Sequence, residues 1–368
     1  VTPYYRAEGV PILRNLNIKE NYLDDSDILF LDRSYAESQI SKQIRAGDVL
    51  TVHTGYIGTS CVVPEKYDKC LTFTTLITTT DNSVLKGEFL AQYLNSDIGM
   101  SALQSVTTQG GRQNLNTNDF VKVEIQFPSL LEQSNICAML RNIDNLITLH
   151  QRKCDETKEL KKYMLQKMFP KNGEKNPEIR FEGFTDDWEQ CKLGDVCSRV
   201  QGNDGRMELP TLTISAGNGW MRQEDRFSGN IAGKEQKNYT LLRKGELSYN
   251  HGNSKLAKYG TVFSLQTYEE ALVPRVYHSF KVESGSADFI EYYFSTKMPN
   301  RELRKLISSG ARMDGLLNIG YDDFMGIKMM FPSTLEQDKI AEYFRALDHL
   351  ITLHQRESIF AFILKNIT

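Results

Sequence analysis

The sequence contains none of the short motifs that mark common catalytic or nucleotide-binding sites. GxGxxG and GxxxxGK[ST] are both missing, so nothing indicates a dinucleotide fold or an ATPase. HExxH and GxSxG do not occur either. The chain has no Pro-Pro dipeptide, which excludes the Asn/Asp-Pro-Pro-Tyr tetrapeptide of adenine methyltransferases. The sequence therefore predicts a protein without catalytic chemistry of these kinds.

Long apolar runs, paired cysteines and surplus charge are missing as well. No apolar run approaches the 18 or so residues of a membrane span, and the polar start does not resemble a signal peptide. The net charge of −3 gives no electrostatic indication of nucleic acid. The six cysteines form no CxxC pair, so we expect reduced thiols and a cytoplasmic location. At 368 residues, the chain can form two or three domains.

A long internal repeat dominates what is present. Phe127–Arg152 (FPSLLEQSNICAMLRNIDNLITLHQR) returns 204 positions later as Phe331–Arg356 (FPSTLEQDKIAEYFRALDHLITLHQR). Sixteen of the 26 aligned residues are identical, including the run LITLHQR. A near-copy of that length indicates an internal duplication.

Each copy predicts a long helix. Ser129 with Glu132, and Ser333 with Glu336, have the spacing of a capping box, in which the serine caps the helix and the glutamate reaches back. The first helix can extend to Phe169, before a proline and an Asn-Gly pair, which makes a rod of roughly 60 Å. Apolar residues with a histidine recur at a spacing close to 3.5, typical of helices that pack along one another. These packing positions are Ile136, Leu140, Ile143, Ile147, His150, Ile340, Phe344, Leu347, Ile351 and His354.

The two histidines on this seam have two interpretations. A polar group that fixes the alignment of the helices is favoured, because a single polar residue on such a seam can set its register. A metal or catalytic role for His150 and His354 is the alternative, although the sequence gives no metal-ligand spacing. No metal site is predicted.

The remaining sequence predicts two mixed globular segments. In residues 1–126, β-branched and aromatic runs predict strands, GEFLAQYLN predicts a helix, and a further strand at Val121–Phe127 leads into the long helix. Residues 191–331 repeat the same order of landmarks after a polar linker at 171–190. The first copy has no counterpart of Pro177–Arg199. We expect domains at 1–127 and 171–331, and helical regions at 128–170 and, shortened, at 332–368. The changed apolar end, SIFAFILKNIT, is expected to pack on the other helix.

Several polar loops are candidate DNA contacts. Arginine pairs well with guanine, and glutamine or asparagine with adenine, in the major groove. A solvated surface loop or an ordinary turn is the competing interpretation of each loop. The candidate residues are Arg112, Gln113, Asn114, Arg312, His53, Thr54, Tyr56, Asn250, His251, Asn253 and Lys255. The aromatic run Tyr292-Tyr293-Phe294 is expected in the core instead of stacking on bases.

The repeated helix and the run PEIRFEGFTDDWEQCKLGDV at Pro177–Val196 resemble the specificity subunit of a type I restriction–modification system. The motifs FPxxxEQ, DxLITLHQR and RFxGFTDDWEQxKLGD occur together and in that family's order, and the likeness covers essentially the whole chain. The resemblance implies an α+β fold: two mixed α/β target-recognition domains joined by two long antiparallel helices, with an internal pseudo-two-fold repeat.

The resemblance also implies a function. Each recognition domain would read one half of a bipartite, asymmetric DNA site, and the helices would set the half-site spacing and dock two methyltransferase subunits. This chain would be non-catalytic and bind no cofactor, with S-adenosylmethionine, ATP and Mg expected in the methyltransferase and restriction subunits. The alternatives are the recognition portion of a fused methyltransferase–nuclease and a truncated or inactive coiled-coil scaffold without a DNA role.

Overall fold

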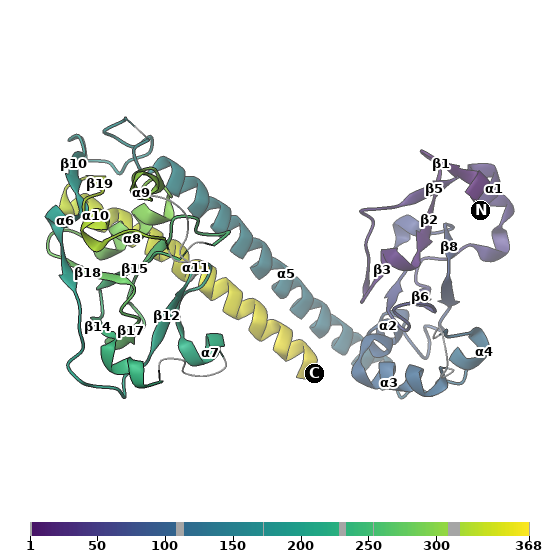
Figure 1. Cartoon of the computed structure of the whole chain (residues 1–368). Coiled ribbons are helices and arrows are strands. Elements are labelled where there is room, and N and C mark those ends of the chain that lie inside the picture. Colours follow the sequence, from purple (N-terminus) through teal and green to yellow (C-terminus); the bar gives the residue numbers. More distant parts are fainter. Residues whose placement is uncertain are drawn as a thin grey trace. The chain divides into compact units, whose positions relative to one another are not determined.

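The computed structural model describes residues 2–107, 114–171, 173–227, 233–252, 254–307 and 317–367. The chain divides into two compact units (Figure 1). The first unit comprises residues 1–148 with 360–368, and the second comprises residues 149–359. Both units mix short strands with helices, which confirms the α+β fold class. No helix in the described part of the chain is long and apolar enough to cross a membrane.

The first unit is built on small, mostly antiparallel sheets. One has the order β1-β5-β2-β8, with β2 and β8 parallel, and another has the order β7-β6-β9. The strands are β1 (Tyr5–Arg6), β2 (Val10–Arg14), β3 (Ile18–Lys19), β4 (Tyr22–Leu23), β5 (Leu29–Leu31), β6 (Val49–Val52), β7 (Ser60–Val62), β8 (Leu71–Phe73) and β9 (Thr75–Thr78). The helices are α1 (Arg33–Ser38), α2 (Gly87–Asn95), α3 (Asp97–Val106) and α4 (Thr117–Phe120), before the long α5 (Leu130–Lys167). Short 3-10 turns lie at Thr2–Tyr4, Asn15–Asn17, Ile40–Lys42 and Glu65–Tyr67.

The second unit repeats this plan with additions. Its main sheet has the order β11-β18-β15-β16, and β10 pairs with β19. The strands are β10 (Glu189–Lys192), β11 (Cys197–Val200), β12 (Leu212–Ser215), β13 (Gly219–Arg222), β14 (Thr240–Arg243), β15 (Leu247–Asn250), β16 (Thr261–Ser264), β17 (Glu270–Val273), β18 (His278–Val282) and β19 (Lys328–Phe331). The helices are α6 (Leu193–Val196), α7 (Gln223–Phe227), α8 (Ala287–Ser295), α9 (Asn300–Leu306), α10 (Tyr321–Met325) and the C-terminal α11 (Thr334–Ile367), with a 3-10 turn at Gly233–Asn238.

A matched turn precedes the central strand of each main sheet. Gly47 has φ +91° and Gly245 has φ +84°, a left-handed conformation that glycine adopts without a steric penalty. In each turn an acidic side chain closes the loop: Asp48 accepts a hydrogen bond from a backbone N–H at 2.7 Å, and Glu246 does the same at 2.7 Å. The Gly-Asp and Gly-Glu landmarks of the sequence repeat are therefore equivalent turns.

The long helix α5 contains 38 residues without an internal glycine or proline, which corresponds to about 57 Å. It ends two residues before the predicted limit, and Met168 and Phe169 after its last turn are buried in the second unit. The ring of Phe169 lies 5.6 Å from that of Phe289 and 6.0 Å from that of Phe344 on α11. The aromatic core of the second unit therefore anchors the end of α5.

Contacts inside the second unit show that α5 and α11 run in opposite directions. His150 meets His354, Cys154 approaches the carbonyl oxygen of Ile351, and Lys161 binds Asp348, so rising numbers on one helix face falling numbers on the other. This confirms the antiparallel helix pair, which Figure 1 shows in teal and yellow.

Two local predictions were wrong. Residues 123–127 form no strand, because they have no pairing partner in the described part of the first unit, whereas the equivalent β19 pairs with β10. Glu336 does not reach back to its cap, because Arg180 binds its carboxylate through two hydrogen bonds of 2.7 Å. The tail contacts the other helix as predicted, since Lys365 binds Asp144 of α5 at 2.7 Å and Ala361 is buried, while Phe360, Phe362 and Ile363 are exposed.

Candidate functional site

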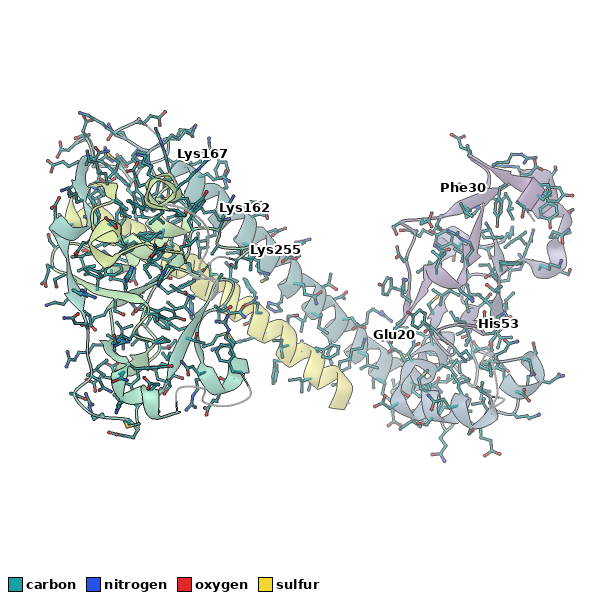
Figure 2. All side chains as sticks on the ribbon, in the orientation of Figure 1. Glu20, Phe30, His53, Lys162, Lys167 and Lys255 are labelled. Atoms are coloured by element: carbon teal, nitrogen blue, oxygen red, sulfur yellow. The ribbon has the colours of Figure 1, made fainter. Side chains whose placement is uncertain are left out.

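The candidate recognition loop of the first unit follows strand β6. The His53 ring Nδ1 lies 3.0 Å from Asn114 Oδ1, and the backbone N–H of Leu115 donates to the His53 carbonyl at 2.9 Å. Asn15 Nδ2 donates to Thr54 Oγ1 at 3.1 Å, which fixes the loop from a third segment. The Tyr56 side chain is 89% exposed. The loop is thus internally braced and presents an aromatic ring to solvent; Figure 2 labels His53.

The equivalent loop of the second unit follows strand β15. Asn250 Oδ1 accepts from the Gly252 N–H at 3.0 Å, and its Nδ2 donates to the Ile214 carbonyl at 3.2 Å. Lys255 is exposed on the same loop and is also labelled in Figure 2. The pattern of a braced asparagine turn carrying an exposed side chain resembles the first loop, so both units place polar groups at the same end of an equivalent strand.

His251 differs from its neighbours because it is only 5% exposed. Its Nδ1 lies 2.7 Å from the Leu317 carbonyl oxygen, and its Nε2 lies 2.7 Å from the Val276 carbonyl oxygen. Both ring nitrogens are therefore engaged with backbone inside the unit. This burial disfavours the base contact predicted for His251 and gives it a role in holding three segments together.

Four of the predicted DNA-contact residues lie outside the described part of the chain. They are Arg112, Gln113, Asn253 and Arg312. Of these, Arg112 and Gln113 directly precede Asn114, which pairs with His53. The predicted contacts of all four stay predictions.

The aromatic run Tyr292-Tyr293-Phe294 is buried, as expected of core residues. Tyr292 lies on α8, and its hydroxyl donates to Asp348 Oδ2 at 2.9 Å. Burial raises the pKa of Tyr292, and the adjacent Asp348 carboxylate adds to the shift. This ring is therefore a neutral core group that carries a hydrogen bond to α11, and it is not available for stacking on bases.

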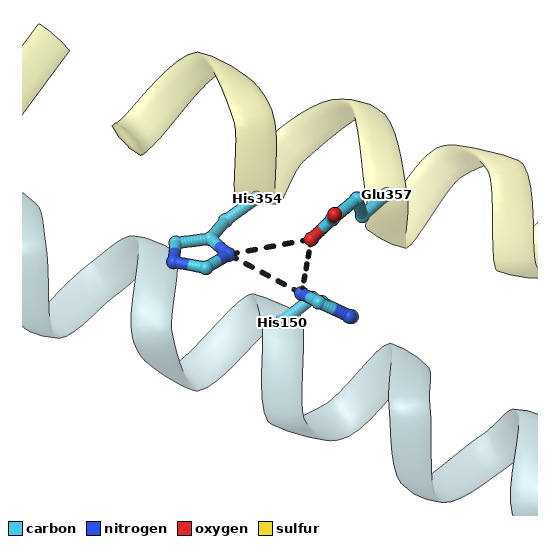
Figure 3. Close-up of side chains that lie close together, drawn as sticks. All are labelled: His150, His354 and Glu357. Carbon is cyan, nitrogen blue, oxygen red and sulfur yellow. Dashed lines mark hydrogen bonds and ion pairs between the residues drawn. The ribbon is translucent and has the colours of Figure 1, made fainter. Parts of the chain in front are cut away.

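The predicted packing positions on the long helices are buried or half-buried. Ile143, Ile340, Phe344 and Leu347 are buried, and the remaining ones are half-buried. The two seam histidines face each other, with their Nδ1 atoms 3.2 Å apart (Figure 3). Glu357 Oε2 lies 2.9 Å from the His150 Nδ1 and 3.6 Å from the His354 Nδ1. Among the described residues, these three side chains form the one His, Cys, Asp and Glu group with the geometry to hold a metal ion.

Two equivalent ion pairs link α5 and α11. The lysine comes from α5 in one pair and from α11 in the other. In the second unit Lys161 of α5 binds Asp348 of α11 at 2.5 Å. In the first unit Lys365 of α11 binds Asp144 of α5 at 2.7 Å. Each residue of one pair lies 204 positions from its counterpart in the other. The repeat thus supplies the same interhelical contact twice, although these residues were missed as site candidates.

A glutamine joint that sequence reasoning also missed attaches each globular part to its long helix. Gln133 is fully buried on α5; its Oε1 accepts from the Lys86 backbone N–H at 2.9 Å, and its Nε2 donates to the carbonyls of Val84 at 3.0 Å and Pro128 at 2.8 Å. On α11, Gln337 Oε1 accepts from the Ser286 N–H at 3.1 Å. The bonded N–H belongs to the residue that precedes α2 or α8. The identity of this glutamine in both FPSxLEQ copies was the available signal.

Three buried cysteines are poor nucleophiles. Burial raises the pKa of Cys61 to about 12 and that of Cys70 to about 11, which keeps both thiols protonated at neutral pH. Because the thiolate is the reactive form, these residues are inert packing groups. The same holds for Cys137 on α5, whose pKa burial raises to about 11.

The chain is similar to known proteins. Residues 3–159 match the family model of the type I restriction modification DNA specificity domain. The type I restriction enzyme MjaVIII specificity subunit of Methanocaldococcus jannaschii is 22% identical over 97% of this chain and 80% of its own length. The chain is therefore similar to the specificity subunits of type I restriction–modification systems, and the family-model match lies in residues 3–159.

A solved structure agrees in fold. The type I restriction–modification S subunit from M. genitalium has a TM-score of 0.55 and 12% identity, over 99% of this chain and 92% of that one. The HsdS subunit from Thermoanaerobacter tengcongensis has a TM-score of 0.49 and 16% identity, over 99% of this chain and 91% of that one. At 12% identity, the likeness to the M. genitalium S subunit is evidence for a shared fold and for nothing more.

Proposed function

We propose that this chain selects the DNA sequence at which a type I complex acts, with each globular part reading one half of a bipartite, asymmetric site. The observation that carries this proposal is the duplicated joint. Gln133 and Gln337 hold two globular parts to near-identical helices through equivalent bonds, while the loops that follow β6 and β15 differ in sequence. A constant attachment with variable loops fits two readers of different half-sites, whose separation a stiff helix sets.

The helices also supply a surface for partners. Leu146 and Leu149 of α5 are exposed, and so are their counterparts Leu350 and Leu353 on α11. Exposed leucines at equivalent positions of both repeats favour docking of two copies of one partner. We assign these positions to two methyltransferase subunits, which would carry S-adenosylmethionine and methylate adenine. Restriction subunits, with ATP and Mg, would complete the complex in the cytoplasm.

This division of labour agrees with the chemistry of the chain. A target adenine must leave the base stack to be methylated, so its pocket lies in the methyltransferase, and the surrounding bases are read elsewhere. The net charge of −3 fits a reader whose partners provide much of the phosphate contact.

The test compares methylomes of cells with and without the gene. Loss of one bipartite methyl-adenine motif on deletion, and its return on complementation, is the expected result. An unchanged methylome contradicts DNA selection by this chain and supports the scaffold alternative. Methylation by the purified chain alone would instead support a fused methyltransferase.

A sharper test uses the two loop arginines, which stand at equivalent places of the repeat. Arg112→Ala should relax one half-site and leave the other intact, and Arg312→Ala should do the reverse. Loss of a bidentate contact to guanine costs about 1–3 kcal/mol of discrimination. Methylation assays of the reconstituted complex on sites varied in one half measure this directly. If both variants keep the parent's preference in both halves, the arginines do not read bases.

A further inference from the structure

Three potential metal ligands from two helices converge on one point. His150 comes from α5, and His354 and Glu357 come from α11 (Figure 3). The Nδ1 atoms of the two histidines are 3.2 Å apart, and Glu357 Oε2 lies 2.9 Å from one and 3.6 Å from the other. The three atoms thus form a nearly equilateral triangle in which every member can offer a lone pair.

The size of this triangle matches a metal coordination sphere. Zinc binds histidine nitrogen and carboxylate oxygen at about 2.0–2.2 Å, with tetrahedral geometry. Two ligands of such a tetrahedron are separated by roughly 3.3–3.5 Å. The three separations in the triangle lie on both sides of that value. Small side-chain rotations that move the two Nδ1 atoms and Oε2 by a few tenths of an ångström would therefore bring all three within bonding distance of one ion.

Protonation alone fits the triangle less well. Two neutral imidazoles that face each other through Nδ1 share one proton, and Glu357 Oε2 needs a donor from the same pair. A neutral histidine whose Nδ1–H donates to the carboxylate has no second Nδ1 hydrogen for the other ring, so one of the three contacts lacks a proton of its own. A divalent cation satisfies the three lone pairs together and neutralises the carboxylate. We propose that His150, His354 and Glu357 form a zinc-binding site that bridges α5 and α11.

The surroundings suit a site with three protein ligands and a water. His354 borders a groove that is lined also by Cys154, Asp155, Lys158 and Gln355. Both histidines are half-buried, so the groove gives an ion access from solvent and leaves room for a fourth ligand. His354 and Glu357 are spaced i and i+3, which places them on one face of α11. Facing helices of a bundle are a common support for such ligand sets.

The third ligand, Glu357, is present in only one copy of the repeat. His150 and His354 are equivalent residues, but the counterpart of Glu357 is Lys153, which is exposed. The duplication therefore explains why two histidines meet, and a difference between the copies supplies the carboxylate. A metal held by both helices would fix their axial alignment at this point, a property that does not depend on DNA recognition.

The experiment uses the full chain without a histidine tag, stripped with a chelator and titrated with zinc sulfate by calorimetry. We expect one zinc ion per chain and a higher melting temperature with zinc. His150→Gln, His354→Gln and Glu357→Gln should each weaken zinc binding by at least about 10- to 100-fold, since loss of even a partner of a ligand has that effect. Cobalt(II) should give the visible absorption of a tetrahedral site in the parent chain only.

His349→Gln is the matched control, because His349 is exposed on the same helix. It should bind zinc as the parent does. Circular dichroism establishes that each variant is folded. Absence of zinc binding by the folded parent overturns the proposal, as does unchanged binding in the two seam-histidine variants. Stabilisation that follows pH and ignores zinc would identify a histidine–glutamate ion pair in place of a metal site.

Discussion

The two globular units follow one plan, and two of their differences involve a single stretch. The sheet β11-β18-β15-β16 of the second unit has four strands, whereas the equivalent sheet β7-β6-β9 of the first unit has three; the extra strand is β11. In the second unit β10 pairs with β19, while residues 123–127 of the first have no strand partner among the described residues. Strand β10 and most of β11 lie in Pro177–Arg199, a stretch that aligns before residue 1 of the first copy.

The two units also differ at the glutamates in the first turns of the long helices. Glu336 is 1% exposed and is held by Arg180, which lies in the same stretch. Its counterpart Glu132 is exposed. Identical residues of the repeated motif therefore have different surroundings: Glu336 is buried against Arg180, whereas Glu132 faces solvent.

The largest effect is expected from the aromatic anchor of α11. Phe344 is fully buried against Phe169 and Tyr292, so Phe344→Ala should lower the free energy of unfolding of the second unit by about 3–5 kcal/mol. The equivalent Leu140 is half-buried, and Leu140→Ala should cost under about 2 kcal/mol. Urea denaturation, together with calorimetry or hydrogen exchange, measures the change in the free energy of unfolding for both variants. Equal costs would remove this difference between the units.

A smaller difference is expected at the helix starts. Glu336→Gln should destabilise the second unit by about 2–3 kcal/mol, because Arg180 loses a charged partner in a site where it is largely shielded from water. Glu132→Gln should change the stability by no more than about 0.5 kcal/mol. Tryptophan fluorescence can follow the first variant, since Trp188 and Trp220 both lie in the second unit. A large effect of Glu132→Gln would show that it has a partner in solution.

The glutamine joint should behave alike in both units. Gln133→Ala and Gln337→Ala each leave a partly buried backbone N–H without its acceptor, which costs about 1 kcal/mol. Hydrogen exchange should show faster exchange at the starts of α2 and α8, respectively. Protection that is unchanged at either helix would break the equivalence proposed for the joint.

The smallest effect concerns a buried acid that only the second unit has. Burial raises the pKa of Glu291, whose counterpart in the first unit is Ala91. A raised folded-state pKa gives stability that is full below the ordinary value of 4.5 and is lost as the pH rises through the folded-state pKa. Glu291→Gln should therefore stabilise the unit by less than about 1 kcal/mol near pH 8, relative to its effect at pH 4. An effect that is the same at both values would contradict the ionisation cost.

Local patterns predicted the long elements well and the contacts between distant segments poorly. The 3.5 spacing and the terminal proline located α5 to within two residues at its end, and GEFLAQYLN is α2. The strand predicted at residues 121–127 failed, since strand formation depends on a partner that composition cannot reveal. His251 looked like a loop residue in sequence, and only the fold places it between two backbone carbonyls.

Each glutamine joint has a property that matters for how the globular parts can change. Among the described residues of the globular part, Gln133 and Gln337 hydrogen-bond to the main chain and to none of the side chains. Every amino acid other than proline provides that N–H group, so most substitutions in the domain keep the bond. Gly285 is an exception, because a Cβ atom there would lie too close to Gln337 Oε1. The hydrogen bond therefore depends little on which side chains the globular part carries. Such a joint allows one domain to be replaced by another of the same fold while the helix that carries it stays the same.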